Sequence, residues 1–137
     1  MATLVFDIET SAQPVENFDE AQQEYLFRET EKIEDPAGRA AKREEITRFM
    51  SLWPLTSQVV CIAMLNAESQ RGQSLFLAED YEEEAEENAP VKFVPCADEF
   101  ELLTAFWDVA KHYDHIVTFN GRGFDVPFIY LLSLIHI

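Results

Sequence analysis

The first apolar stretch of the chain, TLVFDIET at residues 3–10, places two acids inside a run that is otherwise typical of a β-strand. β-Branched and aromatic residues dominate this run, and it ends in a polar cluster. Successive side chains of a strand point to opposite faces, so Asp7 and Glu9 are expected to share one face. The apolar side chains at the even positions are expected on the other face: Leu4, Phe6 and Ile8.

Two acids on one face of a strand repel each other unless a positive charge lies between them. Two residues of strand rise separate such carboxylates by roughly 6–7 Å. At an effective dielectric constant near 20, the repulsion between two ionised groups at that distance is about 2.5 kcal/mol. A divalent cation bound between Asp7 and Glu9 would offset this repulsion, since hard cations prefer carboxylate oxygens.

Composition limits the function of the chain without deciding it. With 137 residues, of which 47% are hydrophobic and 12% aromatic, it is expected to form one globular domain. A net charge of −16 argues against a broad basic surface for nucleic acid, but it is compatible with a nuclease whose acids bind metal. No signal peptide or apolar run of transmembrane length is present, so a cytoplasmic protein without a membrane partner is expected.

Residues 11–54 are expected to form a helical insertion after the first strand. Asn17 or Asp19 is a candidate N-cap for a first helix. Asp35, followed by Pro36 at the first helical position, is a candidate N-cap for a second helix.

The rest of the chain alternates between strand and helix patterns. SQVVCIAML is typical of a strand covered on both faces, and QSLFLAE follows it after a turn signal as the second strand of a hairpin. The acidic run EDYEEEAEENAP is expected to be a loop. ADEFELLTAFWDVAKHY predicts an amphipathic helix capped by Asp98, HIVTFN a strand, and GRGFDVPFIYLL a further helix. The expected apolar stripe of the amphipathic helix is Phe100, Leu103, Phe106, Trp107 and Ala110. This order of elements indicates an α/β fold.

A second acid follows the last predicted strand, in VTFNGRGFDVPF at residues 117–128. The strand leads into a turn at Asn120 in which Gly121 and Gly123 are expected to supply positive φ angles. Asp125 then falls in the first turn of the next helix. Either it is only a helix cap, or it joins the two strand-borne acids in one site.

The two acidic stretches together resemble a known family. FDIET resembles the first exonuclease motif of the DEDD superfamily, and FNGRGFD, with an Asn four residues before a Phe-Asp pair, resembles the second. The chain is similar, from residue 3 to about residue 131, to predicted 3′–5′ exonucleases related to the proofreading domain of family B DNA polymerases. The resemblance implies a ribonuclease H-like mixed sheet with flanking helices.

The resemblance also implies a reaction, the hydrolysis of phosphodiester bonds with two Mg²⁺ or Mn²⁺ ions. By similarity, Asp7 would bridge both ions, Glu9 would bind the ion that carries the attacking water, and Asp125 would hold the second ion. Paired ions about 4 Å apart stabilise both the attacking and the leaving oxygens of such a displacement. Asn120 and Phe124 would position the 3′ end of a DNA or RNA substrate.

One part of the family pattern is missing from this sequence. The third motif, a Tyr or His followed four residues later by Asp, does not occur in it. The last six residues, LSLIHI, match a translated reading frame of a sequencing-library adapter. We therefore expect residues 1–131 to be an incomplete exonuclease domain truncated at its C-terminus, residues 132–137 to be a non-native tail, and the chain itself to be inactive.

Two other functions fit parts of the same pattern. The stretch FDIET superficially resembles the nucleophile strand of haloacid-dehalogenase-like phosphatases, although Glu9 stands where those enzymes have a second Asp. A non-catalytic ribonuclease H-like domain that binds a protein partner is the main alternative, and the acidic run at residues 79–87 would suit it. Metal binding distinguishes this alternative from the exonuclease.

Overall fold

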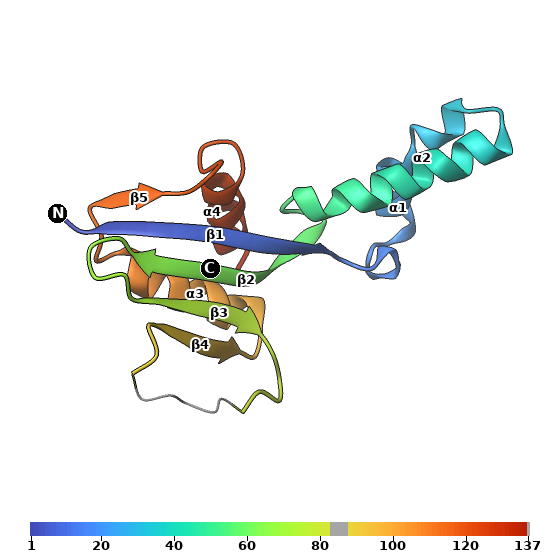
Figure 1. The fold of residues 1–137 in the computed structure, drawn as a ribbon. Helices are drawn as coiled ribbons and strands as arrows, with labels where there is room; N and C mark the ends of the chain where they lie inside the picture. The colour runs from blue at the N-terminus through green and yellow to red at the C-terminus, as the bar shows by residue number, and fades with distance from the viewer. Residues whose placement is uncertain (83–87, 137) are drawn as a thin grey trace. The chain divides into compact units, whose positions relative to one another are not determined.

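The computed structural model describes residues 1–82 and 88–136 of the chain (Figure 1). The chain divides into two compact units. The first unit comprises Met1–Glu9 and Val59–Ile137, and the second comprises Thr10–Gln58. The second unit covers the stretch expected to be a helical insertion.

The first unit is built on a mixed sheet of five strands in the order β4-β3-β2-β1-β5. The strands are β1 (Thr3–Ala12), β2 (Ser57–Asn66), β3 (Gly72–Leu77), β4 (Val91–Cys96) and β5 (His115–Val117). Strand β5 pairs in parallel with β1, β4 pairs in parallel with β3, and β2 and β3 form the expected antiparallel pair. Helices α3 (Glu99–Ala110) and α4 (Asp125–His136) flank this sheet (Figure 1). The prediction of an α/β fold with a mixed sheet and flanking helices is confirmed.

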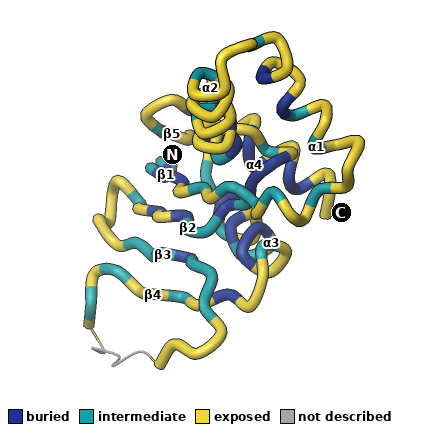
Figure 2. The backbone as a smooth tube through the Cα atoms, turned by 90° about the vertical axis from the view of Figure 1, so that its right-hand side faces the viewer, coloured by how far each residue is buried: buried dark blue, intermediate teal, exposed yellow. Residues whose placement is uncertain are grey.

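The alternation predicted for β1 sets the position of the core. Leu4, Phe6 and Ile8 are 1%, 3% and 5% exposed, whereas Asp7 and Glu9 between and beyond them are exposed. The Phe6 ring meets the edge of the Phe106 ring of α3 at a centroid distance of 5.1 Å. Buried positions therefore gather where the sheet meets α3 and α4, as the dark blue segments of Figure 2 show.

Helix α3 begins where its sequence predicts, with the Asp98 side chain accepting a hydrogen bond from the Glu101 backbone N–H at 2.8 Å. The predicted apolar stripe is wrong at two positions, because Phe100 and Trp107 are 50% and 38% exposed. The buried face is rotated around the helix axis and includes Leu102, which is fully buried. The Trp107 indole N–H donates to Ser133 Oγ of α4 at 2.7 Å, so this ring lies where the two helices meet rather than under the sheet.

Strand β4 is an element that the sequence analysis missed. Its short run VKFVPC contains Pro95, which lacks a backbone donor and disfavours a strand in the interior of a sheet. At the end of the strand order this cost disappears, because an edge strand leaves half of its backbone groups unpaired. The acidic run predicted as a loop connects β3 to β4, and its residues 83–87 lie outside the described part of the chain.

The other edge of the sheet is β5, whose three residues are all exposed. Helix α4 continues through residues 132–136 and buries Leu132 and Ser133 at 3% and 6% exposure. That residues 132–137 are non-native remains a prediction about the gene, and Ile137 lies outside the described residues.

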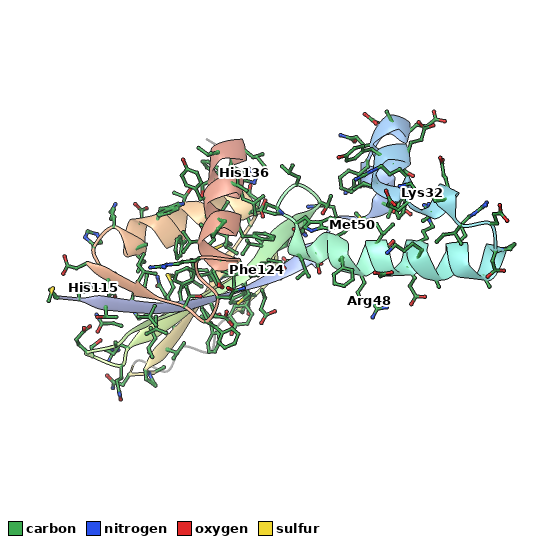
Figure 3. All side chains as sticks on the ribbon, turned by 90° about the horizontal axis from the view of Figure 1, so that it is seen from above. Lys32, Arg48, Met50, His115, Phe124 and His136 are labelled. Carbon is green, nitrogen blue, oxygen red and sulfur yellow. The ribbon has the colours of Figure 1, made fainter. Side chains whose placement is uncertain are left out.

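The second unit contains helices α1 (Glu20–Phe27) and α2 (Pro36–Phe49) and three short 3₁₀ helices. The 3₁₀ helices are η1 (Val15–Asn17), η2 (Thr30–Lys32) and η3 (Met50–Leu52). Asp19 rather than Asn17 caps α1, through a capping box with Gln22, and Asp35 caps α2 as predicted. The Arg43 guanidinium of α2 lies 3.7 Å from the centre of the Phe27 ring of α1, and Figure 3 shows Arg48 projecting from α2 on the side away from α1.

Candidate active site

Asp7 and Glu9 lie on the face of β1 opposite to the one that packs against α3 and α4. Both residues are exposed, and the apolar residues between which they alternate point into the core. Neither carboxylate has a hydrogen-bond or ion-pair partner among residues 1–82 and 88–136. Two acceptor groups on one rigid strand are therefore free to bind a cation or a hydrogen-bond donor.

The second acidic stretch forms a tight turn between β5 and α4. The Asn120 carbonyl accepts hydrogen bonds from the backbone N–H groups of Gly123 at 3.0 Å and Phe124 at 2.8 Å. Positive φ was expected at Gly121 and Gly123, and this expectation is wrong, because no described glycine has a positive φ. The two glycines instead leave space for neighbouring side chains. A Cβ at Gly121 would overlap the Thr118 methyl group, and a Cβ at Gly123 would lie 2.7 Å from Asn120 Oδ1.

Thr118 lies beside this turn and was not identified as a site residue from the sequence. Its methyl group occupies the space beside Gly121, and its Oγ1 is a buried hydroxyl without a hydrogen-bond partner among the described residues. The apolar-polar pattern gives no signal for this role, because a threonine is an ordinary residue in a strand.

Asp125 is the first residue of α4 and is 2% exposed. Its carboxylate accepts no hydrogen bond from any residue in the described part of the chain, so the simple helix-cap role is not observed. Phe124, which precedes it, packs against Phe128 with a ring-centroid distance of 5.1 Å. Figure 3 shows Phe124 at the beginning of α4 and His136 at its far end.

The structure brings only some of the predicted residues together. Asp7 and Glu9 share one exposed strand face, and Asn120, Phe124 and Asp125 share one turn and helix start. The described residues contain no group of three or more His, Cys, Asp or Glu side chains that could hold a metal ion. The pair on β1 fits a hard divalent cation as a partial ligand set of two unpartnered carboxylates. The buried Asp125 does not complete that set.

No helix among the described residues is both long enough and apolar enough to cross a membrane. Residues 1–131 match the family described as "DNA polymerase family B, exonuclease domain". DNA polymerase 1 of Saccharolobus solfataricus (strain ATCC 35092 / DSM 1617 / JCM 11322 / P2) is 47% identical over 36 residues, which are 26% of this chain and 4% of that protein. The chain therefore belongs to the exonuclease-domain family of family B DNA polymerases.

Proposed function

We propose that this chain is part of a metal-dependent 3′–5′ exonuclease that removes nucleotides from the 3′ end of DNA or RNA. The observation that carries the proposal is the pair of unpartnered, exposed carboxylates of Asp7 and Glu9 on β1, in a chain that belongs to an exonuclease-domain family. The 3′–5′ direction rests on the resemblance of FDIET and FNGRGFD to the first and second exonuclease motifs.

Asp7 and Glu9 are the residues of this chain that would hold a divalent ion. The resemblance to the second exonuclease motif assigns Asp125 as a further ligand in the complete exonuclease domain. Two bound Mg²⁺ or Mn²⁺ ions supply an activated water and charge stabilisation for phosphodiester hydrolysis. Strand β1 holds both residues on one face, from which the exposed side chains can turn toward a shared ion. Asn120 and Phe124 bind the terminal nucleotide, the first through its side-chain amide and the second through the face of its ring.

We propose in addition that the isolated chain of 137 residues has little nuclease activity. The burial of Asp125 supports this proposal. Asp125 is 2% exposed and does not join Asp7 and Glu9 in a ligand group within the described residues. Two carboxylates can bind a cation weakly, but two-metal hydrolysis requires more ligands than this pair provides.

Metal binding and activity are best measured separately. Mn²⁺ binding is followed by the relaxation of water protons for the unmodified chain, for Asp7→Asn, and for Asp80→Asn as a control that removes an exposed acid outside the site. Activity is followed with single-stranded DNA and RNA labelled at the 5′ end, on which 3′–5′ digestion leaves a ladder of shortened labelled products.

We expect Mn²⁺ binding in the unmodified chain and in Asp80→Asn, and its loss in Asp7→Asn, with little or no ladder from any of the three. Equal Mn²⁺ binding by all three proteins, or binding by none of them, would contradict the role of Asp7 as a metal ligand. A ladder that requires Mn²⁺ and disappears in Asp7→Asn would support the exonuclease and overturn the proposal of inactivity.

A further inference from the structure

A cavity of about 300 Å³ lies on the side of the sheet opposite to Asp7 and Glu9. Its apolar floor is formed by Leu4 of β1 and Met64 of β2, which are 1% and 4% exposed. Val109 and Tyr113, in and just beyond the last turn of α3, form one wall. Leu4 and Asp7 point to opposite faces of β1, so this cavity is separate from the candidate active site.

The pairing of the strands places polar side chains along the rim of this cavity. Gln73 of β3 is paired with Met64 on one side and with Lys92 of β4 on the other, so these three side chains form one row across the sheet. Arg71 lies two residues before Gln73 and also lines the cavity. The register of three strands therefore brings Arg71 and Lys92 to the same opening.

These side chains present hydrogen-bond donors and no competing acid. The Lys92 ammonium has no hydrogen-bond or ion-pair partner in the described part of the chain. One terminal nitrogen of Arg71 donates to the Ala89 carbonyl at 3.4 Å, which leaves its other N–H groups available. The Tyr113 hydroxyl accepts a hydrogen bond from Asn66 Nδ2 at 3.3 Å, so its own proton is free to be donated.

The charge of this cavity contrasts with that of the whole chain. The sequence has 26 Asp and Glu residues but only 10 Lys and Arg residues. Arg71, Lys92, Lys111 and Arg122 are the basic residues of the first unit, and two of them line this one cavity. None of the described lining residues is acidic. Converging donors over an apolar floor are the usual features of a small-molecule site.

We propose that this cavity binds a phosphate monoester with a small flat body, such as a nucleoside monophosphate. The phosphate lies between the Arg71 guanidinium and the Lys92 ammonium, because charge-assisted hydrogen bonds to phosphate are the strongest these donors form. The flat body lies on Leu4 and Met64 with its edge against the Tyr113 ring. This inference does not depend on the exonuclease activity, since no residue of the cavity belongs to the candidate active site.

The test is isothermal titration of the full chain with AMP, with adenosine and with inorganic phosphate, in the presence of EDTA so that divalent ions do not contribute. Arg71→Gln and Lys92→Gln each remove one rim cation. Lys111→Gln is the matched control, because Lys111 pairs with Asp108 at 2.6 Å and does not line the cavity. Tyr113→Phe removes the hydroxyl and leaves the ring. Arg71 and Lys92 are exposed, so their replacement is not expected to unfold the chain, and circular dichroism checks this.

We expect AMP to bind more tightly than either phosphate or adenosine. Each rim-cation variant is expected to weaken AMP binding by about 10-fold or more, and Tyr113→Phe by about fivefold. Lys111→Gln should leave it unchanged. The proposal is overturned if AMP does not bind, if adenosine binds as tightly as AMP, or if Lys111→Gln weakens binding as much as Lys92→Gln does.

Discussion

Replacing Asp7 by Asn should stabilise the metal-free chain and remove its response to Mg²⁺. Asp7 and Glu9 point to the same face of β1, and neither carboxylate is paired with a described cation. The substitution keeps the size of the side chain and removes one charge. Without Mg²⁺, the gain in the free energy of unfolding of Asp7→Asn over the unmodified chain measures the repulsion between the two acids. With Mg²⁺, this difference should disappear, because the bound cation offsets the repulsion in the unmodified chain.

The exposure of both residues decides the size of this effect. Because both carboxylates are in contact with solvent, the dielectric constant of water applies rather than the value near 20 assumed from sequence. At a separation of roughly 6.6 Å the repulsion is then about 0.6 kcal/mol. For a domain of this length, 0.6 kcal/mol corresponds to a rise in Tm of about 2 °C. Mg²⁺ at ten times its dissociation constant should stabilise the unmodified chain by about 1.4 kcal/mol, or about 5 °C.

The assay is thermal unfolding followed by circular dichroism at low ionic strength, in EDTA and in MgCl₂. Any loss of a negative charge relieves some repulsion in a chain of net charge −16, so Asp80→Asn provides the baseline. In EDTA, the Tm of Asp7→Asn should be higher than that of Asp80→Asn. On addition of Mg²⁺, the Tm of Asp7→Asn should rise less than that of the unmodified chain or of Asp80→Asn. If Asp7→Asn and Asp80→Asn have the same Tm in both solutions, the carboxylate pair neither repels nor binds a cation, and the reasoning is refuted.

Three further predictions test the fold. Phe106→Ala should lower the free energy of unfolding, measured by urea titration, by about 3–5 kcal/mol, because Phe106 is 2% exposed at the contact of α3 with β1. A loss below about 1 kcal/mol would contradict this placement of Phe106. Burial raises the pKa of the Cys96 thiol. A thiol reagent should therefore modify Cys61 in the folded chain and Cys96 only after denaturation. Equal rates of modification in the folded chain would contradict the burial of Cys96. The hydrogen bond from the Thr3 backbone N–H lowers the pKa of Glu68. The ionised Glu68 side chain therefore stabilises the folded chain at neutral pH, and this contribution is lost as the pH falls through the lowered pKa. Glu68→Gln should therefore show a smaller loss of Tm on acidification, and an identical loss would exclude this contribution.

The sequence predicted the elements whose local signals agree with their environment. The alternation in TLVFDIET predicted that Leu4, Phe6 and Ile8 share one face of β1 and that the two acids share the other, because the side-chain period of a strand follows from backbone geometry alone. The caps at Asp35 and Asp98 were predicted for a similar reason, and Asp19 was one of two candidates for the cap of α1. Each cap satisfies N–H groups within three residues, so its energy depends little on the rest of the fold.

The errors arise where distant parts of the chain decide the outcome. Pro95 argues against a strand in general, but β4 lies at a sheet edge, which only the strand order reveals. The stripe of α3 was placed incorrectly because helical spacing leaves the angle of the buried face open by one residue, and contacts with the sheet and with Ser133 set that angle. Positive φ angles were predicted for the glycines of the turn, but the described glycines have none, and their missing Cβ atoms leave space for the Thr118 and Asn120 side chains instead.

The sequence by itself therefore determined the family, the α/β class and the acids that are candidates for metal binding. It did so because motifs and periodicity are local properties of a chain. Only the tertiary structure decided that Asp7 and Glu9 are exposed while Asp125 is buried, and that Arg71 and Lys92 meet over an apolar floor. Exposure and the convergence of side chains from separate strands depend on packing and register, which no single segment of the sequence specifies.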